Sequence, residues 1–288
     1  MSLIRAATVV LLRQATAPEV FLVRRHGKSG FMGGATVFPG GKVDAVDADT
    51  PSCGRTPAAC AAALNIESPD EAHAYFVAAI RELHEEAHVI LARDRAGNLP
   101  AAEAVAALND ELDSLREGHR IPNGAVRQLW EAHGLRPALD LVAPFAWWVT
   151  PVAEPRRFDT RFFVGLQPEG QRAAMDGHET TAERWATATD AIAAHEAGGD
   201  VYLPPPTLHT LHRISELPGG AQDVFAALAT GGSGPCILPH YRQEEPGTAI
   251  ITLPDDGAHP GVEASGKRNR FVLRNGRFYR LVAGEGLL

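Results

Sequence analysis

The sequence has little cysteine and no long apolar run. Its three cysteines, Cys53, Cys60 and Cys236, are an odd set without a CxxC pair in 288 residues. This count argues against a disulfide framework, so we expect free thiols and a reducing compartment. No run reaches the roughly 18 apolar residues of a membrane helix, and no secretory signal is visible. We therefore expect a cytoplasmic location and no membrane partner.

An excess of positive charge is also missing. The chain has 27 Lys and Arg against 35 Asp and Glu, a net charge of −8. This balance argues against nucleic acid as the main partner, because a phosphate backbone attracts basic surfaces. It does not exclude an anionic small substrate, since a bound metal ion can supply local positive charge. With 45% hydrophobic residues, the chain can bury a large core.

Three carboxylates cluster in the stretch Arg81 to Leu91, which reads RELHEEAHVIL. On a helix, Glu82, Glu85 and Glu86 project from one face within about one turn. Glutamates on a helix face are usually solvated, but small and apolar residues on both sides of these predict a buried helix. Buried carboxylates need a partner, and an all-oxygen set suits Mg²⁺ or Mn²⁺ better than zinc. Arg81 would orient Glu82 or bind a phosphate oxygen.

The run Arg81-Glu82-Leu83-His84-Glu85-Glu86 and the turn Phe38-Pro39-Gly40-Gly41 resemble the box of the Nudix hydrolases, G-x5-E-x7-R-E-U-x-E-E-x-G-U with U aliphatic. The match is specific in the core and departs from the pattern at the edges. Gly41 lies 40 residues before Arg81 instead of 14, so about 26 residues are inserted. His73 stands where the first box Glu is expected, and His88 stands where the last box Gly is expected.

An insertion inside the box resembles the Nudix branch that includes a peroxisomal coenzyme A diphosphatase. Further matches are Arg24-Arg25-His26, Phe31-Met32-Gly33-Gly34, Trp148-Val149-Thr150-Pro151 and the run from Arg157 to Phe163. The resemblance covers roughly residues 5 to 215. The coenzyme A signature of other Nudix enzymes, R-S-x2-L-x4-G-x-V-x-F-P-G-G, is kept at Arg25, Gly34 and the final turn. His26, Ser29 and Thr36 depart from it.

The resemblance implies an α/β fold, an α/β/α sandwich around a mixed sheet, with residues 1–230 as the Nudix domain. Residue patterns predict strands near 6–12, 20–25, 143–150 and 157–167, and helices near 69–88, 101–117 and 126–133. We interpret residues 42–68 as an inserted surface excursion with a short helix. Residues 95–135 are an inserted helical pair that would form a lid, a homodimer surface or plain packing. Residues 231–288 form a β-rich extension whose basic residues would be a solvated edge or a clamp for an anionic substrate.

The resemblance also implies metal-dependent hydrolysis of a diphosphate that links a nucleoside to a second moiety. Glu82, Glu85 and Glu86 would hold Mg²⁺ or Mn²⁺, which lowers the pKa of a bound water. Glu179 or a box glutamate, Glu85 or Glu86, would take the proton. Glu71 and Glu183 are the other candidates for an additional carboxylate.

The expected partner is an anionic, nucleotide-type small molecule, and its ligands are predicted at Arg25, Arg157, Arg161, Gly40 and Gly41. The two glycines permit close approach of the backbone to a ligand. Arg157, Asp159 and Arg161 fall on one face of a strand, where they would grip phosphate or form a structural ladder. Coenzyme A or acyl-coenzyme A is the leading substrate, with ADP-ribose, NADH and nucleotide sugars as alternatives. The rival class is a non-catalytic Nudix module that senses a nucleotide.

Overall fold

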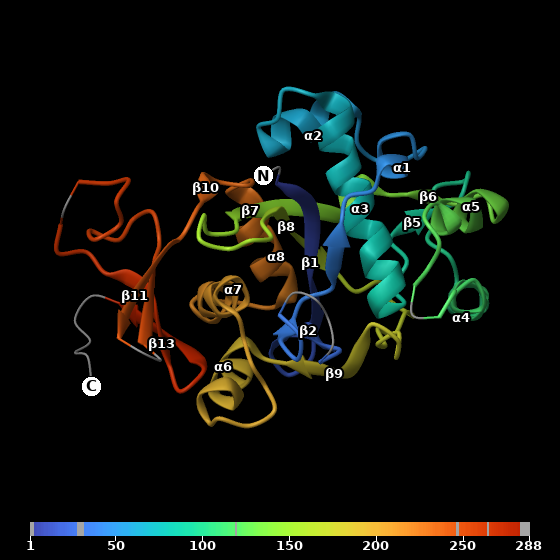
Figure 1. Ribbon diagram of the computed structural model, residues 1–288. Coiled ribbons are helices and arrows are strands. Elements are labelled where there is room, and N and C mark those ends of the chain that lie inside the picture. The colour runs from blue at the N-terminus through green and yellow to red at the C-terminus, as the bar shows by residue number, and fades with distance from the viewer. Residues whose placement is uncertain (1–2, 28–31, 119, 246–247, 264, 283–288) are drawn as a thin grey trace.

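A mixed sheet of eight strands organises the computed structural model, which describes residues 3–27, 32–118, 120–245, 248–263 and 265–282 (Figure 1). The order is β10-β7-β8-β1-β2-β3, with β4 paired to β1 and β9 paired to β2. Strands β1 and β8 run parallel, whereas β1–β2 and β7–β8 are antiparallel. The strands are β1 (Ile4–Gln14), β2 (Pro18–Arg25), β3 (Thr36–Val37), β4 (Gly40–Lys42), β7 (Val142–Val149), β8 (Phe158–Leu166), β9 (Thr180–Ala186) and β10 (Cys236–Ile237).

Helices cover both faces of this sheet. Alternation along β1 sends Val9 and Leu11 into one apolar core and Val10 and Leu12 into the other. The first core is closed by α2 (Pro57–Leu64), α3 (Pro69–Ala87), α4 (Ala102–Ser114) and α5 (Ala125–Ala132), and the second by α6 (Ala188–Glu196), α7 (Pro205–Ser215) and α8 (Ala221–Thr230). The predicted α/β/α sandwich around a mixed sheet is confirmed.

Helix α3 carries the three box glutamates and is buried along most of its length. Ser68 caps its start by accepting a hydrogen bond from the Glu71 N–H at 3.3 Å, and Pro69 occupies the first turn. His88 ends the helix in the left-handed conformation, with φ of +54°. A glycine takes that conformation without strain, which accounts for the glycine that the box motif has at this position.

The two insertions pack against α3. The first contains α1 (Ala45–Ala48) and α2, in which Asp47, Cys60 and Leu64 are buried. It is therefore more than the surface excursion expected from its sequence. The second contains α4 and α5, which bury Leu108, Leu112 and Trp130 in the core shared with α3. Short strands β5 (Ala92–Arg93) and β6 (Arg136–Pro137) pair at its base, and the 3₁₀ turn η1 (Leu139–Leu141) follows.

A separate four-stranded antiparallel sheet lies at the C-terminal end (Figure 1). It consists of β11 (His240–Glu245), β12 (Thr248–Thr252), β13 (Asn269–Arg274) and β14 (Arg277–Val282). His195 of α6 joins it to the main body through the Phe278 carbonyl, 2.7 Å from Nε2. Strand β10 adds to the main sheet beside β7. The domain limits at residues 230 and 231 stay a prediction.

Two basic residues of this sheet, Arg270 and Arg277, bond to partners inside the protein. Arg270 donates to both oxygens of the buried Asp256 at 2.7 Å. Arg277 donates to the backbone carbonyls of His195 and Val201 at 2.9 and 2.6 Å. In the parts of the chain that the structure describes, no helix has the length and apolar character needed to cross a membrane.

Candidate active site

The glycine turn and the box helix meet although 46 residues separate Gly40 from Glu86. The Gly40 N–H donates to Glu86 Oε2 at 2.9 Å. Gly41 lies so close to Glu82 that a Cβ at this position would approach the carboxylate to 2.4 Å. The close approach explains why glycine occupies position 41, and it places the turn over two of the three box glutamates.

Arg81 is 5% exposed, and its guanidinium forms hydrogen bonds to other residues of the protein. Its Nε and Nη2 donate to the two oxygens of Asp47 at 2.9 and 3.0 Å. Its Nη1 donates to Glu82 at 2.8 Å and to Glu85 at 3.1 Å. Of the two predicted roles for Arg81, the structure supports orientation of the glutamates, and the donors are engaged rather than open to a phosphate.

Burial shifts the acidity of the three box carboxyls. It raises the pKa of Glu82 well above its usual range and also raises the pKa of Glu85. Burial raises the pKa of Glu86 to about 8, against the opposing effects of the Gly40 N–H and the Arg25 guanidinium. Negative charge on Glu179 adds to the rise at both Glu85 and Glu86. These carboxylates therefore favour a neighbouring positive charge.

Glu179 comes from a different part of the chain, immediately before β9. Its N–H donates to Asp176 Oδ2 at 2.9 Å, and its carbonyl accepts from the His26 N–H at 3.0 Å. The residue is exposed and lies within electrostatic reach of Glu85 and Glu86. Its backbone is thus anchored through both its N–H and its carbonyl, and its negative charge acts on two of the box glutamates.

The other two candidates for the extra carboxylate are engaged elsewhere. Glu183 is exposed and accepts a hydrogen bond from the Met175 N–H. Glu71 lies in the first turn of α3 and pairs with Arg5 at 3.8 Å. Among the three, the electrostatic neighbours of Glu85 and Glu86 include Glu179 alone.

The predicted substrate arginines separate into two groups. Arg25, at the end of β2, lowers the pKa of Glu86 through its charge, and its Nε is buried without a hydrogen-bond partner among the described residues. Arg161 is 3% exposed, donates to the Leu64 carbonyl at 2.9 Å and lies 3.9 Å from the Trp147 ring centroid. Arg157 donates to the Thr150 carbonyl at 3.0 Å. The structure brings Arg25 to the carboxylates and favours the structural alternative for Arg161.

The departures from the family motifs have structural roles where they are described. His73 is buried, and its Nε2 lies 2.8 Å from Ser52 Oγ, so it contributes no carboxylate in place of the expected box Glu. Thr36 is buried and donates from its N–H to the Tyr202 carbonyl at 2.7 Å. Ser29 and Phe31 lie outside the described residues.

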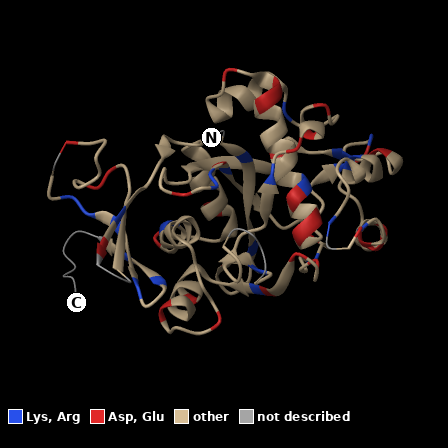
Figure 2. Cartoon of the chain, in the orientation of Figure 1, with Lys and Arg blue, Asp and Glu red and all other residues tan. Residues whose placement is uncertain are grey.

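The box glutamates offer oxygen donors of the type that suits a hard divalent cation, although the described side chains are not arranged around a metal position. Figure 2 shows the acidic residues grouped on the C-terminal half of α3. Glu82, Glu85 and Glu86 offer oxygen ligands, and burial raises their pKa values, so a bound cation would offset the cost of ionising them. Arg81 already binds oxygens of Glu82 and Glu85. Within the described ranges, no three His, Cys, Asp or Glu side chains lie in an arrangement that could hold a metal ion.

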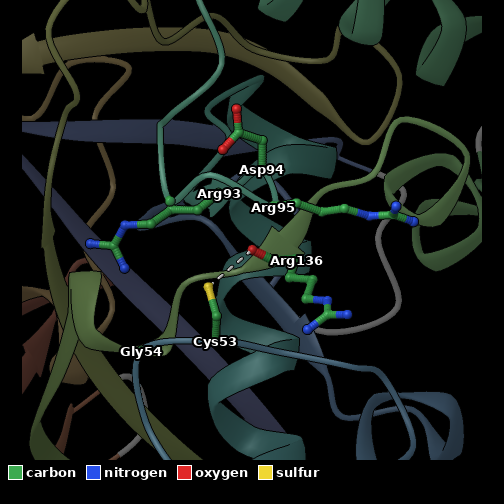
Figure 3. Close-up of a pocket in the computed structure, with 7 residues that line it drawn as sticks. Cys53, Gly54, Arg93, Asp94, Arg95 and Arg136 are labelled. Atoms are coloured by element: carbon green, nitrogen blue, oxygen red, sulfur yellow. Dashed lines mark hydrogen bonds between the residues drawn. The ribbon is translucent and has the colours of Figure 1, made fainter.

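A cavity of about 510 Å³, shown in Figure 3, is not lined by these carboxylates. It is lined by Cys53, Gly54, Arg93, Asp94, Arg95, Gly97 and Arg136. Arg93 is paired with Asp140 at 2.6 and 2.9 Å. In Figure 3 the side chains of Arg93 and Arg95 extend to opposite sides, so the guanidinium groups do not converge on one ligand. The cavity contains none of the predicted site residues.

A glycine turn that contacts Glu82 and Glu86 of the box helix, beside a mixed sheet, is the arrangement of a Nudix hydrolase. Residues 50–214 match the family model of the NUDT19 Nudix domain, and the chain belongs to this family. That match begins within the first insertion and spans α2, the box helix, the second insertion and strands β7, β8 and β9.

Similar proteins agree with this assignment. The acyl-coenzyme A diphosphatase NUDT19 of Xenopus laevis is 27% identical over 313 residues, which cover 93% of this chain and 81% of that protein. The human protein of the same name is 26% identical over 256 residues, covering 73% of this chain and 68% of that protein. The crystal structure of a Nudix hydrolase from Alicyclobacillus acidocaldarius superposes with a TM-score of 0.56 at 27% identity, covering 74% of this chain and 90% of that one.

The sequence identified the box glutamates and Glu179 but missed three residues that hold them. Asp47, Arg116 and Asp176 are buried and contact the box helix or the loop of Glu179. Each lies in a segment that reads as a loop or an insertion, and each makes a contact to a residue more than 30 positions away: Asp47 to Arg81, Arg116 to Glu85, and Asp176 to Arg116. An acidic residue in such a segment is normally solvated, so composition gave no signal.

Proposed function

We propose that this protein hydrolyses the diphosphate of coenzyme A or acyl-coenzyme A, with 3′,5′-ADP and 4′-phosphopantetheine or its acyl derivative as products. The reaction class rests on the convergence of Glu85, Glu86 and Glu179 from two distant segments. The substrate is supported by the relatives in Xenopus laevis and Homo sapiens, both of which are acyl-coenzyme A diphosphatases.

The carboxylates divide the work in this proposal. Glu82, Glu85 and Glu86 would hold Mg²⁺ or Mn²⁺, which supplies positive charge to the diphosphate and acidifies a bound water. Arg81 keeps Glu82 and Glu85 in place through its two short contacts. Glu179 is the base that takes the proton from the attacking water, because it is exposed while Glu86 is buried.

Arg25 and the glycine turn position the substrate. The Arg25 guanidinium lies near Glu86 and would bind a non-bridging phosphate oxygen. The water oxygen forms a new bond to one phosphorus, and the bond from that phosphorus to the bridging oxygen breaks, so that the other phosphate leaves. Arg157 and Arg161 stay predictions as phosphate ligands. A homodimer and a cytoplasmic location also stay predictions from the sequence.

Product analysis on a substrate panel tests the proposal. Coenzyme A, an acyl-coenzyme A, ADP-ribose, NADH and UDP-sugars would be incubated with Mg²⁺ or Mn²⁺, and the products separated by chromatography. We expect preferred cleavage of coenzyme A or its acyl ester. Preferred cleavage of another substrate would overturn the substrate but keep the reaction class. No cleavage by protein that binds the metal would favour a nucleotide sensor.

A further inference from the structure

We infer that Arg116 is a positioning residue of the active site, because its bridge to Asp176 fixes Glu179 opposite Glu85 and Glu86. The bridge itself is a structural feature. Its effect on turnover rests on the proposed function, in which Glu179 is the base. Arg116 follows helix α4 of the second insertion, so this assigns the insertion a role in the chemistry.

Arg116 is almost fully buried, with 4% of its side chain exposed. Its Nη2 donates to the Glu85 carbonyl at 2.9 Å, and its Nε donates to Asp113 Oδ1 at 3.1 Å. Its Nη1 lies 3.3 Å from Asp176 Oδ2. One guanidinium therefore joins the backbone of the box helix to the loop that precedes β9. A planar fork with fixed donors suits this three-way contact better than a lysine would.

Asp176 transmits the contact to Glu179. Its side chain is 1% exposed, and its Oδ2 accepts the Glu179 N–H at 2.9 Å. Its Oδ1 accepts from the Thr180 N–H at 3.1 Å and from Thr180 Oγ1 at 2.5 Å. The same carboxylate thus receives Arg116 on one side and the start of β9 on the other. A buried carboxylate with these bonds holds its neighbours in one geometry.

Hydrogen bonds hold the insertion that carries Arg116 against the box helix. Trp130 donates to His84 Nδ1 at 3.1 Å, and His84 Nε2 lies 3.1 Å from Asn109 Oδ1. Asn109 donates in turn to the His88 carbonyl at 3.0 Å, at the end of α3. Because α4 is held at the C-terminal half of α3, the backbone of Arg116 has a fixed position, and its side chain extends from there to Asp176.

The loop of residues 167–179 needs such a tether, since it contains no helix or strand. Gln171 ties it to the backbone of Ile90 at 2.8 and 3.0 Å, and the Ala174 N–H donates to the Ala87 carbonyl at 3.1 Å. Those contacts hold its middle. Arg116 and Asp176 hold the end that presents Glu179.

A double-mutant cycle tests the inference. Arg116→Ala, Glu179→Gln and the double variant would be compared with the wild type for kcat and KM on the preferred substrate. We expect Arg116→Ala to lower kcat about 10- to 100-fold, with KM little changed. In the Glu179→Gln background the same change should cost less than about threefold, because residues that act through one another are not additive. Arg127→Ala is the matched control, since Arg127 pairs with Glu131 at 2.7 Å in the same insertion and lies on a surface helix.

Amide hydrogen exchange gives a readout that does not depend on turnover. We expect Arg116→Ala to speed exchange in peptides covering residues 176–181 by about tenfold, and Arg127→Ala to leave it unchanged. Unchanged exchange after Arg116→Ala, or additive losses in the cycle, would overturn the positioning role. If Arg116→Ala does not fold, Arg116→Lys replaces it. Lysine keeps the positive charge but lacks the planar guanidinium, and the variant is judged by the same two measurements, hydrogen exchange and the mutant cycle. If the wild type hydrolyses nothing on the panel, the proposed function fails, and the exchange experiment still decides whether the bridge exists.

Discussion

Asp47 of the first insertion and Arg81 of the box helix form a buried ion pair. Asp47 is 1% exposed and receives two hydrogen bonds from Arg81, which also orients Glu82 and Glu85. The pair links the first insertion to the catalytic helix across 34 residues. Because the two charges are buried together, either one alone would be costly.

Asp47→Asn is therefore expected to lower the free energy of unfolding by about 3 kcal/mol, since it leaves the Arg81 charge only partly compensated. Urea denaturation at pH 7 measures this change. The matched control is Asp49→Asn, because Asp49 is exposed in the same short segment. If the two substitutions had equal, small effects on the free energy of unfolding, Asp47 would contribute little to holding Arg81 in place.

Glu85→Gln tests the assignment of chemistry to the box. The amide keeps the size of the side chain and removes the charge, so we expect kcat to fall about 10²- to 10⁴-fold. Nucleotide affinity should change little, because Arg25 and the glycine turn are intact. Steady-state kinetics and calorimetry measure the two effects, with the exposed Glu183→Gln as control. Hydrolysis that survives Glu85→Gln unchanged would remove Glu85 from the proposed metal ligands.

The residues proposed as metal ligands and base are easier to predict from the sequence than the residues that position them. Glu82, Glu85 and Glu86 are visible because their spacing matches one face of a helix. Asp47 lies in the insertion that the sequence predicts as a surface excursion, because nothing local distinguishes it from the neighbouring acids Asp44 and Asp49. Arg116 and Asp176 are invisible for the same reason, because their partners are distant in the chain.

At the scale of helices and strands, local signals were sufficient for most of the fold. Ser68 and Pro69 mark the start of α3, continuous apolar runs mark β1 and β2, and alternating charged and aromatic residues mark the start of β8. The parallel pairing of β10 with β7 was not predicted, because two residues, Cys236 and Ile237, are too few to show a pattern. The contact of α4 and α5 with the box helix depends on tertiary packing, so the sequence left lid, dimer surface and packing open.

His195 makes the joint between α6 and the C-terminal sheet sensitive to acid. Its Nδ1 accepts the Leu203 N–H at 3.0 Å, so its Nε2 carries the proton and donates to the Phe278 carbonyl at 2.7 Å. Burial lowers the pKa of His195 below 6.5. The neutral ring is thus favoured in the folded state, and its stabilising effect is complete above pH 6.5 and is lost as the pH falls below that value.

His195→Gln is expected to be less stable than the wild type at pH 7 and to lose less stability on acidification to pH 5.5. A single proton changes the free energy of unfolding by at most about 1.4 kcal/mol per pH unit. Urea denaturation of both proteins at the two pH values measures the difference. Parallel pH dependence would show that protonation of His195 does not limit the joint.

At the scale of the whole molecule, a chain with a net charge of −8 concentrates buried carboxylates in one site. Without a cation, burial raises the pKa of Glu86 to about 8. The folded state then holds this proton more tightly than the unfolded chain does. The protonated Glu86 carboxyl therefore contributes its full share to the free energy of unfolding below about pH 4.5, and this contribution is lost as the pH rises toward 8. A divalent cation bound by the box glutamates would offset this loss.

We therefore expect Mg²⁺ or Mn²⁺ to raise the melting temperature, and EDTA to reverse the rise. Metal at about 100 times its dissociation constant stabilises by about 2.7 kcal/mol, a shift of roughly 4–5 °C for a chain of this size. The shift should be larger at pH 8 than at pH 6, where the proton competes with the metal for Glu86. Differential scanning fluorimetry measures it. Glu86→Gln should reduce the shift and flatten its pH dependence, whereas Glu183→Gln should retain both. Equal melting temperatures in Mg²⁺ and EDTA at both pH values would mean that the box glutamates do not hold the cation.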